Sequence, residues 1–519
     1  MIPGCIAPLM SFASYLLIKQ QRKELKSHAR HLSTGVHAIL LALFLCGVAQ
    51  AQSITARISV LSVAPARVEI EGERTDATDA WSFRNQYATA SGLGERIENL
   101  TLSDKSGAQI PVRKIAPGEY KAESAATHFV YEVKLEPPAQ TSDAVYASWL
   151  TTERGLLMPG DLLPKPSSAQ ATNNRSAHLS FILPKAWDVA ANETKQSENQ
   201  FQVGDVERTV FLVGPDLRYR QERVGRLEFS YVTNGRWAFT DEEASSLAAR
   251  ILKEHTEALG GLAARQNALL ILIPFPRPVS ANRWSAEARG GTVTLLSGQN
   301  PSKIAALAQL NVPLTHELFH LWVPNGLALD GDYDWFYEGF TLYQSIRAGM
   351  RLQLLGFQDY LNALSRAFDA YMSIKERDQL SLIEAARQRW RSPTSLIYHK
   401  GLLVAFLYDL TLRQQTKNKQ SLDDVYRELF RHHQSTAARA DGNSTIVNIL
   451  KSQSGMQDFV QQYIEKAVNI DLRSAIAPFG LEIQSGGVRT HLVVSNTLSR
   501  AQRDLLSKFG YNKEAQRRG

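Results

Sequence analysis

The segment HELFH (316–320) places two histidines four residues apart in an apolar stretch that we expect to be helical. Residues four apart lie on one face of a helix, about one turn from each other, so the imidazoles of His316 and His320 can reach one tetrahedral ion. Glu317 points about 100° around the helix, where its carboxylate can address a water molecule on the ion without ligating the ion. The pattern predicts a catalytic zinc site with Glu317 as general base.

Glu338 is the candidate for the third protein ligand, because a catalytic zinc ion needs three such ligands and one open position. It lies 18 residues after His320 in the segment WFYEGF (335–340), where it is a lone carboxylate among aromatic residues. A charge in such surroundings is costly unless it is paired or bound to a metal. We therefore expect His316, His320 and Glu338 to bind one Zn²⁺ ion. The alternative for Glu338 is a half-exposed helix glutamate that binds nothing.

The helix that carries the histidines must have a beginning and an end. Asn311 and Pro313 suit a helix start, and the segment Pro324-Asn325-Gly326 suits a helix end. Upstream, Thr240 and Glu243 form a capping-box pattern that opens an amphipathic helix. Apolar strands are predicted at 268–273 and 292–296. Apolar residues at three- and four-residue spacing then predict helical segments at 304–310, 313–322, 335–348, 357–389, 397–413, 422–433 and 456–467.

The chain before this region has the pattern of a β-rich domain, which we place at residues 52–235. Short strands are predicted where apolar residues alternate with polar ones or cluster, at residues 68–70, 131–135, 210–213 and 227–232. The stretch 159–176 is rich in Pro, Ser and Asn and is typical of a long loop. The predicted fold class is therefore α+β, with an N-terminal β-rich domain followed by a mainly helical domain at 236–470 that carries the zinc site.

These motifs resemble a known group of enzymes. His-Glu-x-x-His followed by Trp-x-x-Glu-Gly-Phe-Thr (335–341) resembles the gluzincin clan of zinc peptidases, and specifically the glycyl aminopeptidase family. The segment IYHKG (397–401) is similar to the Tyr-x-Lys-Gly segment of that family, and FGLE (479–482) to its Gly-Leu-Glu strand. The resemblance covers residues 55–484. It implies a thermolysin-like catalytic domain, aminopeptidase-like zinc peptidase activity on a peptide or protein substrate, and hydrolysis by a zinc-activated water.

The resemblance also implies a donor for the oxyanion that forms during hydrolysis. It places Tyr398 in that role, since a neutral phenol can donate a hydrogen bond. One alternative is a structural Tyr398, with its ring packed and its hydroxyl at the surface. The other is that His399 donates instead.

Two departures from the family pattern change what is expected of this chain. The family typically has a Gly-Gly-Leu-Glu-His strand with a glutamate beside the substrate, whereas this chain has GGTVT (290–294). The sequence thus predicts no carboxylate there for a free α-amine, and leaves aminopeptidase and endopeptidase action open. The family also often ends in a PDZ module. Residues 471–519 are expected to be a C-terminal tail or a truncated PDZ-like remnant.

Residues 1–51 have the pattern of an export signal. Four basic residues between 22 and 30 precede an apolar run at 38–48, which leads into Ala49-Gln50-Ala51. That run is too short to span a bilayer comfortably, so we expect cleavage after Ala51 and no stable membrane span afterwards. Processing as a lipoprotein at Cys46 is the alternative. An exported location, periplasmic or secreted, follows from this prediction.

Loss of residues 1–51 changes the chemistry of the chain. It takes away five basic residues, one acidic residue and both cysteines, Cys5 and Cys46, and lowers the formal net charge from +7 to +3. No basic run with interleaved aromatic residues remains, so we expect no nucleic-acid partner. The sequence predicts no oligomeric state. A second hypothesis is a non-catalytic gluzincin-fold binding protein of the cell envelope, motivated by the missing glutamate strand and the short C-terminus.

Overall fold

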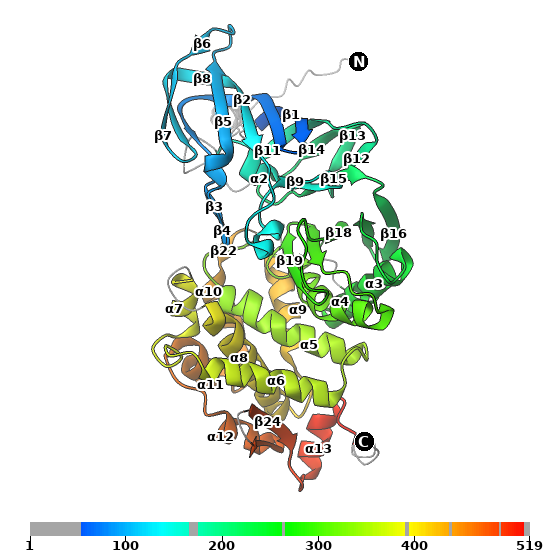
Figure 1. The fold of residues 1–519 in the computed structure, drawn as a ribbon. Helices are drawn as coiled ribbons and strands as arrows, with labels where there is room; N and C mark the ends of the chain where they lie inside the picture. The colour runs from blue at the N-terminus through cyan, green and yellow to red at the C-terminus, as the bar shows by residue number, and fades with distance from the viewer. Residues whose placement is uncertain are drawn as a thin grey trace, which may run out of the picture. The chain divides into compact units, whose positions relative to one another are not determined.

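The computed structural model describes six stretches of the chain, which are residues 53–165, 175–261, 265–389, 394–434, 438–486 and 489–512. They belong to one compact unit, Ser53–Gly519, and the predicted export signal lies outside the described residues. Within this unit a β-rich N-terminal region precedes a mainly helical region (Figure 1). This arrangement confirms the predicted α+β class.

The N-terminal region is built on a nine-stranded sheet. Its strand order is β13-β14-β11-β1-β2-β8-β5-β6, and β7 pairs with β8. Val68 and Ile70 on β2 and Val133 on β8 are fully buried, because alternate residues of these strands face one core. In the order just given, with β7 last, the strands are Thr194–Ser197, Gln200–Val203, Ser176–Ile182, Ser53–Val63, Ala66–Ser82, Glu119–Lys134, Ile97–Ser103, Gln109–Ile110 and Val112–Ala116.

A smaller sheet and a short hairpin complete this region. The smaller sheet has the order β12-β15-β10-β9, formed by Trp187–Ala190, Phe211–Pro215, Gly155–Leu157 and Trp149–Leu150. The hairpin is formed by β3 (Gln86–Tyr87) and β4 (Ala90–Ser91), which pair only with each other among the described strands. The predicted loop 159–176 contains one turn of helix, α2 (Pro159–Leu162), and its residues 166–174 lie outside the described part.

A five-stranded mixed sheet carries one wall of the site. Its strand order is β16-β17-β18-β20-β19. In that order the strands are Arg218–Val224, Leu227–Thr233, Asn267–Pro274, Thr292–Ser297 and Trp284–Arg289. Strands β18 and β20 were predicted, and the structure confirms them. Strand β17 pairs with β18 in parallel, so β16 and β17, which precede the predicted domain boundary at 235, share a sheet with strands that follow it. Strand β19 lies at the edge of this sheet.

Helices form most of the rest of the described chain. The predicted capping box is present, since Thr240 and Glu243 each bond the other's backbone N–H at the start of α3 (Asp241–Ala258). The helix predicted at 357–389 is wrong in extent: it is two helices, because Ser381 and Glu384 form a capping box that starts a new one. No helix among the described residues is long and apolar enough to cross a membrane. The α-helices from α4 to α10 are α4 (Lys303–Glu317), α5 (Thr341–Arg351), α6 (Phe357–Met372), α7 (Leu382–Arg387), α8 (Thr394–Gln415), α9 (Leu422–His433) and α10 (Gly442–Ser452).

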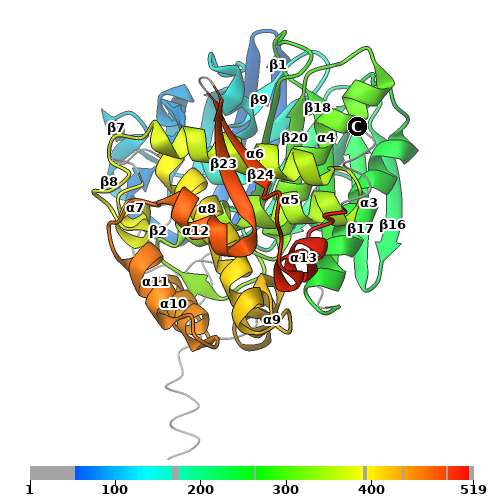
Figure 2. The same ribbon diagram turned by 90° about the horizontal axis from the view of Figure 1, so that it is seen from below.

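The C-terminal residues pack onto these helices. The hairpin of β23 (Leu481–Gly486) and β24 (Arg489–Val494) lies beside α6, where Leu492 N–H donates to Ser365 Oγ (Figure 2). Helix α13 (Arg500–Ser507) contributes Leu505 and Leu506 to the same buried core as the helices. Short helices α11 (Gln457–Val460) and α12 (Leu472–Ile476) precede the hairpin.

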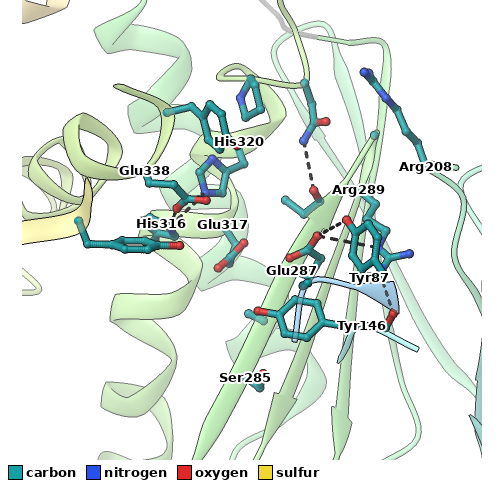
Figure 3. Close-up of a pocket in the computed structure, with 18 of the residues that line it drawn as sticks. Tyr87, Tyr146, Arg208, Ser285, Glu287, Arg289, His316, Glu317, His320 and Glu338 are labelled. Atoms are coloured by element: carbon teal, nitrogen blue, oxygen red, sulfur yellow. Dashed lines mark hydrogen bonds and ion pairs between the residues drawn. The ribbon is translucent and has the colours of Figure 1, made fainter. Parts of the chain in front are cut away.

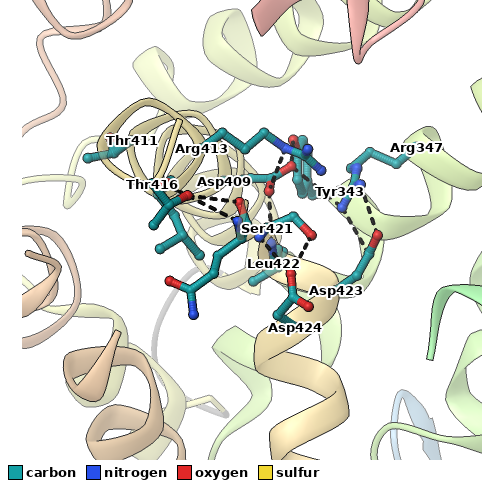
Figure 4. Close-up of polar contacts among 12 residues, drawn as sticks. Tyr343, Arg347, Asp409, Thr411, Arg413, Thr416, Ser421, Leu422, Asp423 and Asp424 are labelled. Carbon is teal, nitrogen blue, oxygen red and sulfur yellow. Dashed lines mark hydrogen bonds and ion pairs between the residues drawn. The ribbon is translucent and has the colours of Figure 1, made fainter. Parts of the chain in front are cut away.

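A buried ionic network joins α5, α8 and α9 (Figure 4). The Arg347 guanidinium of α5 lies 3.0 Å from the Asp423 carboxylate of α9 and 3.5 Å from the Asp409 carboxylate of α8. Asp409 is fully buried and also accepts hydrogen bonds from Arg413, the Tyr343 hydroxyl and a backbone N–H. Such charges are tolerated inside a protein only when they are paired and hydrogen-bonded. The network fixes α5, which directly follows the segment that carries Glu338.

Candidate metal centre and active-site pocket

The two motif histidines lie where a helix tightens. Helix α4 begins at Lys303, capped by the Ser302 hydroxyl, so the predicted start near Asn311 and Pro313 is wrong. The helix continues through Pro313, which costs one backbone hydrogen bond, because its inner face is buried in the core. After Glu317 the backbone changes to a 3-10 turn at Phe319–Leu321. His316 and His320 are both buried, and their Nε2 atoms lie 3.0 Å apart.

Glu338 completes a three-residue cluster. It lies in one turn of π-helix at Trp335–Phe340, whose four aromatic rings bury the segment in the helical core. Its Oε2 lies 3.4 Å from His316 Nε2 and 3.7 Å from His320 Nε2. Zinc bonds to nitrogen and oxygen of about 2.1 Å would set tetrahedral ligand atoms about 3.4 Å apart. The three distances fit one such ion, and the donor set of two imidazoles and one carboxylate suits zinc.

A close helix crossing brings α8 to this cluster. Gly401 of α8 lies against Gly339 of the π-helix so closely that an added Cβ on Gly401 would come within 2.9 Å of Gly339 Cα. Any larger residue at position 401 would require the two backbones to move apart. Tyr398 is one turn before Gly401 on α8 and therefore lies near Glu338, where it lines the same pocket.

The pKa values of the two carboxyl groups at the cluster, Glu338 and Glu317, are shifted in opposite directions. Burial raises the pKa of Glu338, but the neighbouring imidazoles of His316 and His320 prevail and lower it to about 2. Burial raises the pKa of Glu317 to about 8 because that carboxyl has no such partner among the described residues. His320 is oriented by its Nδ1, which lies 2.7 Å from the Val323 carbonyl oxygen. A ring nitrogen held in this way leaves the other nitrogen free to bind a metal.

A cavity of about 1160 Å³ opens over the cluster. His316, His320, Glu317 and Glu338 form one wall, and strand β19 forms the opposite one (Figure 3). Figure 3 shows the Glu317 carboxylate between the His316–Glu338 pair and a second carboxylate on β19, Glu287. A cavity of this size, lined largely by polar and charged side chains, can hold a small molecule or the end of a peptide.

Glu287 is a site residue that the sequence analysis missed. It lies on β19, where its backbone pairs with that of Thr294 on β20, and its side chain lines the cavity. The cavity therefore has a carboxylate on this wall, although residues 290–294 contain none, as predicted. The expected position was in 290–294, but those residues form the turn and the buried strand β20, whereas the cavity side belongs to the edge strand. The polar residues at 285, 287 and 289, alternating before Gly290-Gly291, were the available signal.

Several aromatic hydroxyls also reach the cavity. Tyr398 is half-buried, and burial raises the pKa of its phenol well above the usual range, so that it keeps its proton. His399 is not among the described residues that line the cavity, and burial lowers its pKa. Tyr87 and Tyr146 reach the cavity from the N-terminal region. Strands of one region and helices of the other thus share the site.

No protein-family profile matches the sequence, and neither does any curated protein. Solved structures do match. An aminopeptidase N family protein from Idiomarina loihiensis has 19% sequence identity and a TM-score of 0.68, over 83% of this chain and 79% of that one. A M1 zinc metallopeptidase from Deinococcus radiodurans has 12% identity and a TM-score of 0.54, over 81% of this chain and 94% of that one. The chain has this metallopeptidase fold. A mutant of the Deinococcus protein was solved with a bound Tyr-Ser-Ala substrate, and matches with 12% identity and a TM-score of 0.52, over 81% of this chain and 95% of that one.

Proposed function

We propose that the protein is a zinc-dependent metallopeptidase of the gluzincin type. The observation that carries the proposal is the set of three donor atoms on His316, His320 and Glu338, 3.0 to 3.7 Å apart, with the Glu317 carboxylate beside them in one cavity. A zinc ion in this position supplies a Lewis acid and an activated water for hydrolysis of a peptide bond. The metallopeptidase fold supports the assignment.

Glu317 is the general base in this proposal. Its carboxylate takes a proton from the attacking water and delivers it to the nitrogen of the leaving amine. The Glu317 carboxyl lines the same cavity as the three donor atoms and is not one of them, which supports this role. The Tyr398 phenol donates a hydrogen bond to the oxyanion of the substrate. The half-buried position of Tyr398 on α8, at the cavity wall, supports this role.

We further propose aminopeptidase-like specificity, with Glu287 as the group that holds the free α-amine. An ammonium group donates three hydrogen bonds, and Glu287 offers it a carboxylate across the cavity from Glu317. Glu207 also lines the cavity, but its carboxylate is paired with Arg84. A mutant of the similar Deinococcus metallopeptidase was solved with the tripeptide Tyr-Ser-Ala bound. Nothing in the described geometry favours the non-catalytic binding protein. The leader pattern at residues 1–51 supports an exported protein, periplasmic or secreted.

Metal removal tests the zinc-dependent activity. Dialysis of the purified protein against a chelator should abolish hydrolysis of a short peptide such as Tyr-Ser-Ala, and added Zn²⁺ should restore it. A His320→Ala variant should not be restored under the same conditions. Activity that survives complete removal of zinc would refute the proposal.

The amine specificity needs a separate experiment. The ratio of kcat/KM for Tyr-Ser-Ala to that for its N-acetylated form should favour the free amine. A Glu287→Gln variant should lose most of that preference, since an uncharged amide holds an ammonium weakly. Equal hydrolysis of both peptides by the parent protein would favour endopeptidase action instead.

A further inference from the structure

The carboxylate of Glu287 is held by one of its two oxygens. The Tyr87 hydroxyl donates to Glu287 Oε1 at 2.8 Å, and the Nε atom of Arg289 lies 3.9 Å from the same oxygen. Among the described residues no side chain or backbone group hydrogen-bonds to Oε2. Figure 3 shows this group of three residues on the cavity wall, with the tyrosine beside the carboxylate. One oxygen is thus fixed and the other remains available to a ligand in the cavity.

Tyr87 itself is held in place by guanidinium groups. The Cζ atom of Arg289 lies 4.0 Å from the centre of the Tyr87 ring, and that of Arg84 lies 4.9 Å from it. Arg84 is paired with Glu207, and Arg289 donates to the Tyr146 carbonyl at 3.1 Å. Cation–π contacts of this kind fix the plane of the ring. The hydroxyl is therefore held in one direction, toward Glu287.

The phenol can act only as a donor to Glu287. Burial raises the pKa of Tyr87 to about 12, so the hydroxyl keeps its proton near neutral pH. Its strand, β3, belongs to a two-stranded hairpin that pairs with neither large sheet in the described part of the chain. Through the Tyr87 hydroxyl, the N-terminal region thus contacts the carboxylate proposed to bind the amine. The packing of the Tyr87 ring between the two guanidinium groups does not depend on that hydroxyl.

We infer that Tyr87 is a positioning residue for Glu287 and sets the preference of the site for a free α-amine. The inference rests on the proposed aminopeptidase-like function. By holding Oε1, Tyr87 turns Oε2 toward the position of the substrate ammonium and keeps the carboxylate from rotating toward Arg289. The N-terminal region thereby takes part in substrate selection. Its contribution changes the binding of the substrate more than the rate of the chemical step.

The test is a Tyr87→Phe variant, which removes the hydroxyl and keeps the ring between the arginines. With Tyr-Ser-Ala as the probe, loss of a hydrogen bond to a charged group should raise KM about tenfold and leave kcat within about twofold. The N-acetylated peptide should be hydrolysed as by the parent, so the preference for the free amine should fall about tenfold. A double-mutant cycle with Glu287→Gln should show that Tyr87→Phe has no further effect in that background.

Tyr219→Phe is the matched control, because its hydroxyl also donates to a carboxylate, Asp188 at 3.0 Å, away from the cavity. This variant should hydrolyse both peptides at the rates of the parent protein. Unchanged preference in active Tyr87→Phe would overturn the inference. So would an equal loss on both peptides with a lowered melting temperature, or additive effects in the cycle, since these mark a merely structural role. If the parent hydrolyses neither peptide in the presence of zinc, the proposed function fails, and the inference falls with it.

Discussion

Replacement of Asp423 by asparagine should destabilise the helical region strongly. Asp423 is 7% exposed, and it accepts from Arg347 at 3.0 and 3.1 Å, from Arg351 at 3.0 Å and from Gln344 at 2.8 Å. Although burial raises its pKa, Arg347 and Arg351 hold the pKa of this carboxyl well below the ordinary value, so the native state contains the charged form. An asparagine keeps one acceptor and turns an NH₂ group toward a guanidinium. Breaking a buried ion pair in this way costs about 3–5 kcal/mol.

The measurement is urea unfolding of the parent and of Asp423→Asn, from which the free energies of the first unfolding transition are compared. Glu71→Gln is the control, because the Arg57–Glu71 pair is exposed, with 38% of the glutamate side chain accessible. An exposed pair contributes about 0–1 kcal/mol, so this variant should unfold with the parent. A loss below about 1 kcal/mol in Asp423→Asn would refute the reasoning, since it would mean that water or rearrangement satisfies the arginines.

Three further predictions concern packing, pH and the metal. In Gly401→Ala the new Cβ would lie 2.8 Å from the Trp335 carbonyl oxygen, so the variant should lose about 1–3 kcal/mol and should hydrolyse peptides more slowly. A melting temperature equal to that of the parent would contradict the close backbone packing at this crossing. Burial lowers the pKa of His255 to about 3, whereas an unfolded histidine has a pKa of about 6.5. The unfolded state binds the extra proton between these values, so stability should rise with pH up to about 6.5 and then level, and a His255→Gln variant should lose that part of the slope. Urea unfolding at several pH values checks this, and an unchanged slope would contradict it. Glu338→Gln should weaken zinc binding at least about tenfold by metal analysis after dialysis. Full zinc retention would exclude Glu338 as a ligand.

Elements with complete local signals were predictable from the sequence. Helix α9 was predicted at 422–433 and is found there, because Ser421 and Asp424 cap an amphipathic run. Strand β19 was missed although its polar residues alternate with apolar ones, because two of the three apolar positions are alanines, which are depleted in strands. The π-helix at Trp335–Phe340 was predicted as ordinary helix, because the spacing of apolar residues does not distinguish one π-turn from α-helix.

The candidate site divides in the same way. His316, Glu317 and His320 are close in sequence, and helical spacing alone predicts that the histidines face one point. Glu338 was proposed from its aromatic surroundings, and the structure brings it to the histidines; that the three bind zinc stays a prediction. Glu287 could not be placed, because its contact with the site depends on which strand of a hairpin lies at the sheet edge.

The most direct test of the central claim is the Glu317→Gln variant, measured for both zinc content and hydrolysis. The purified variant should hold zinc like the parent, because Glu317 is not among the three grouped donor atoms. Its kcat for Tyr-Ser-Ala should fall by about 10²–10⁴, the contribution of a general base. A variant that keeps its zinc and hydrolyses the peptide at the rate of the parent would contradict the assignment of Glu317 and the mechanism built on it.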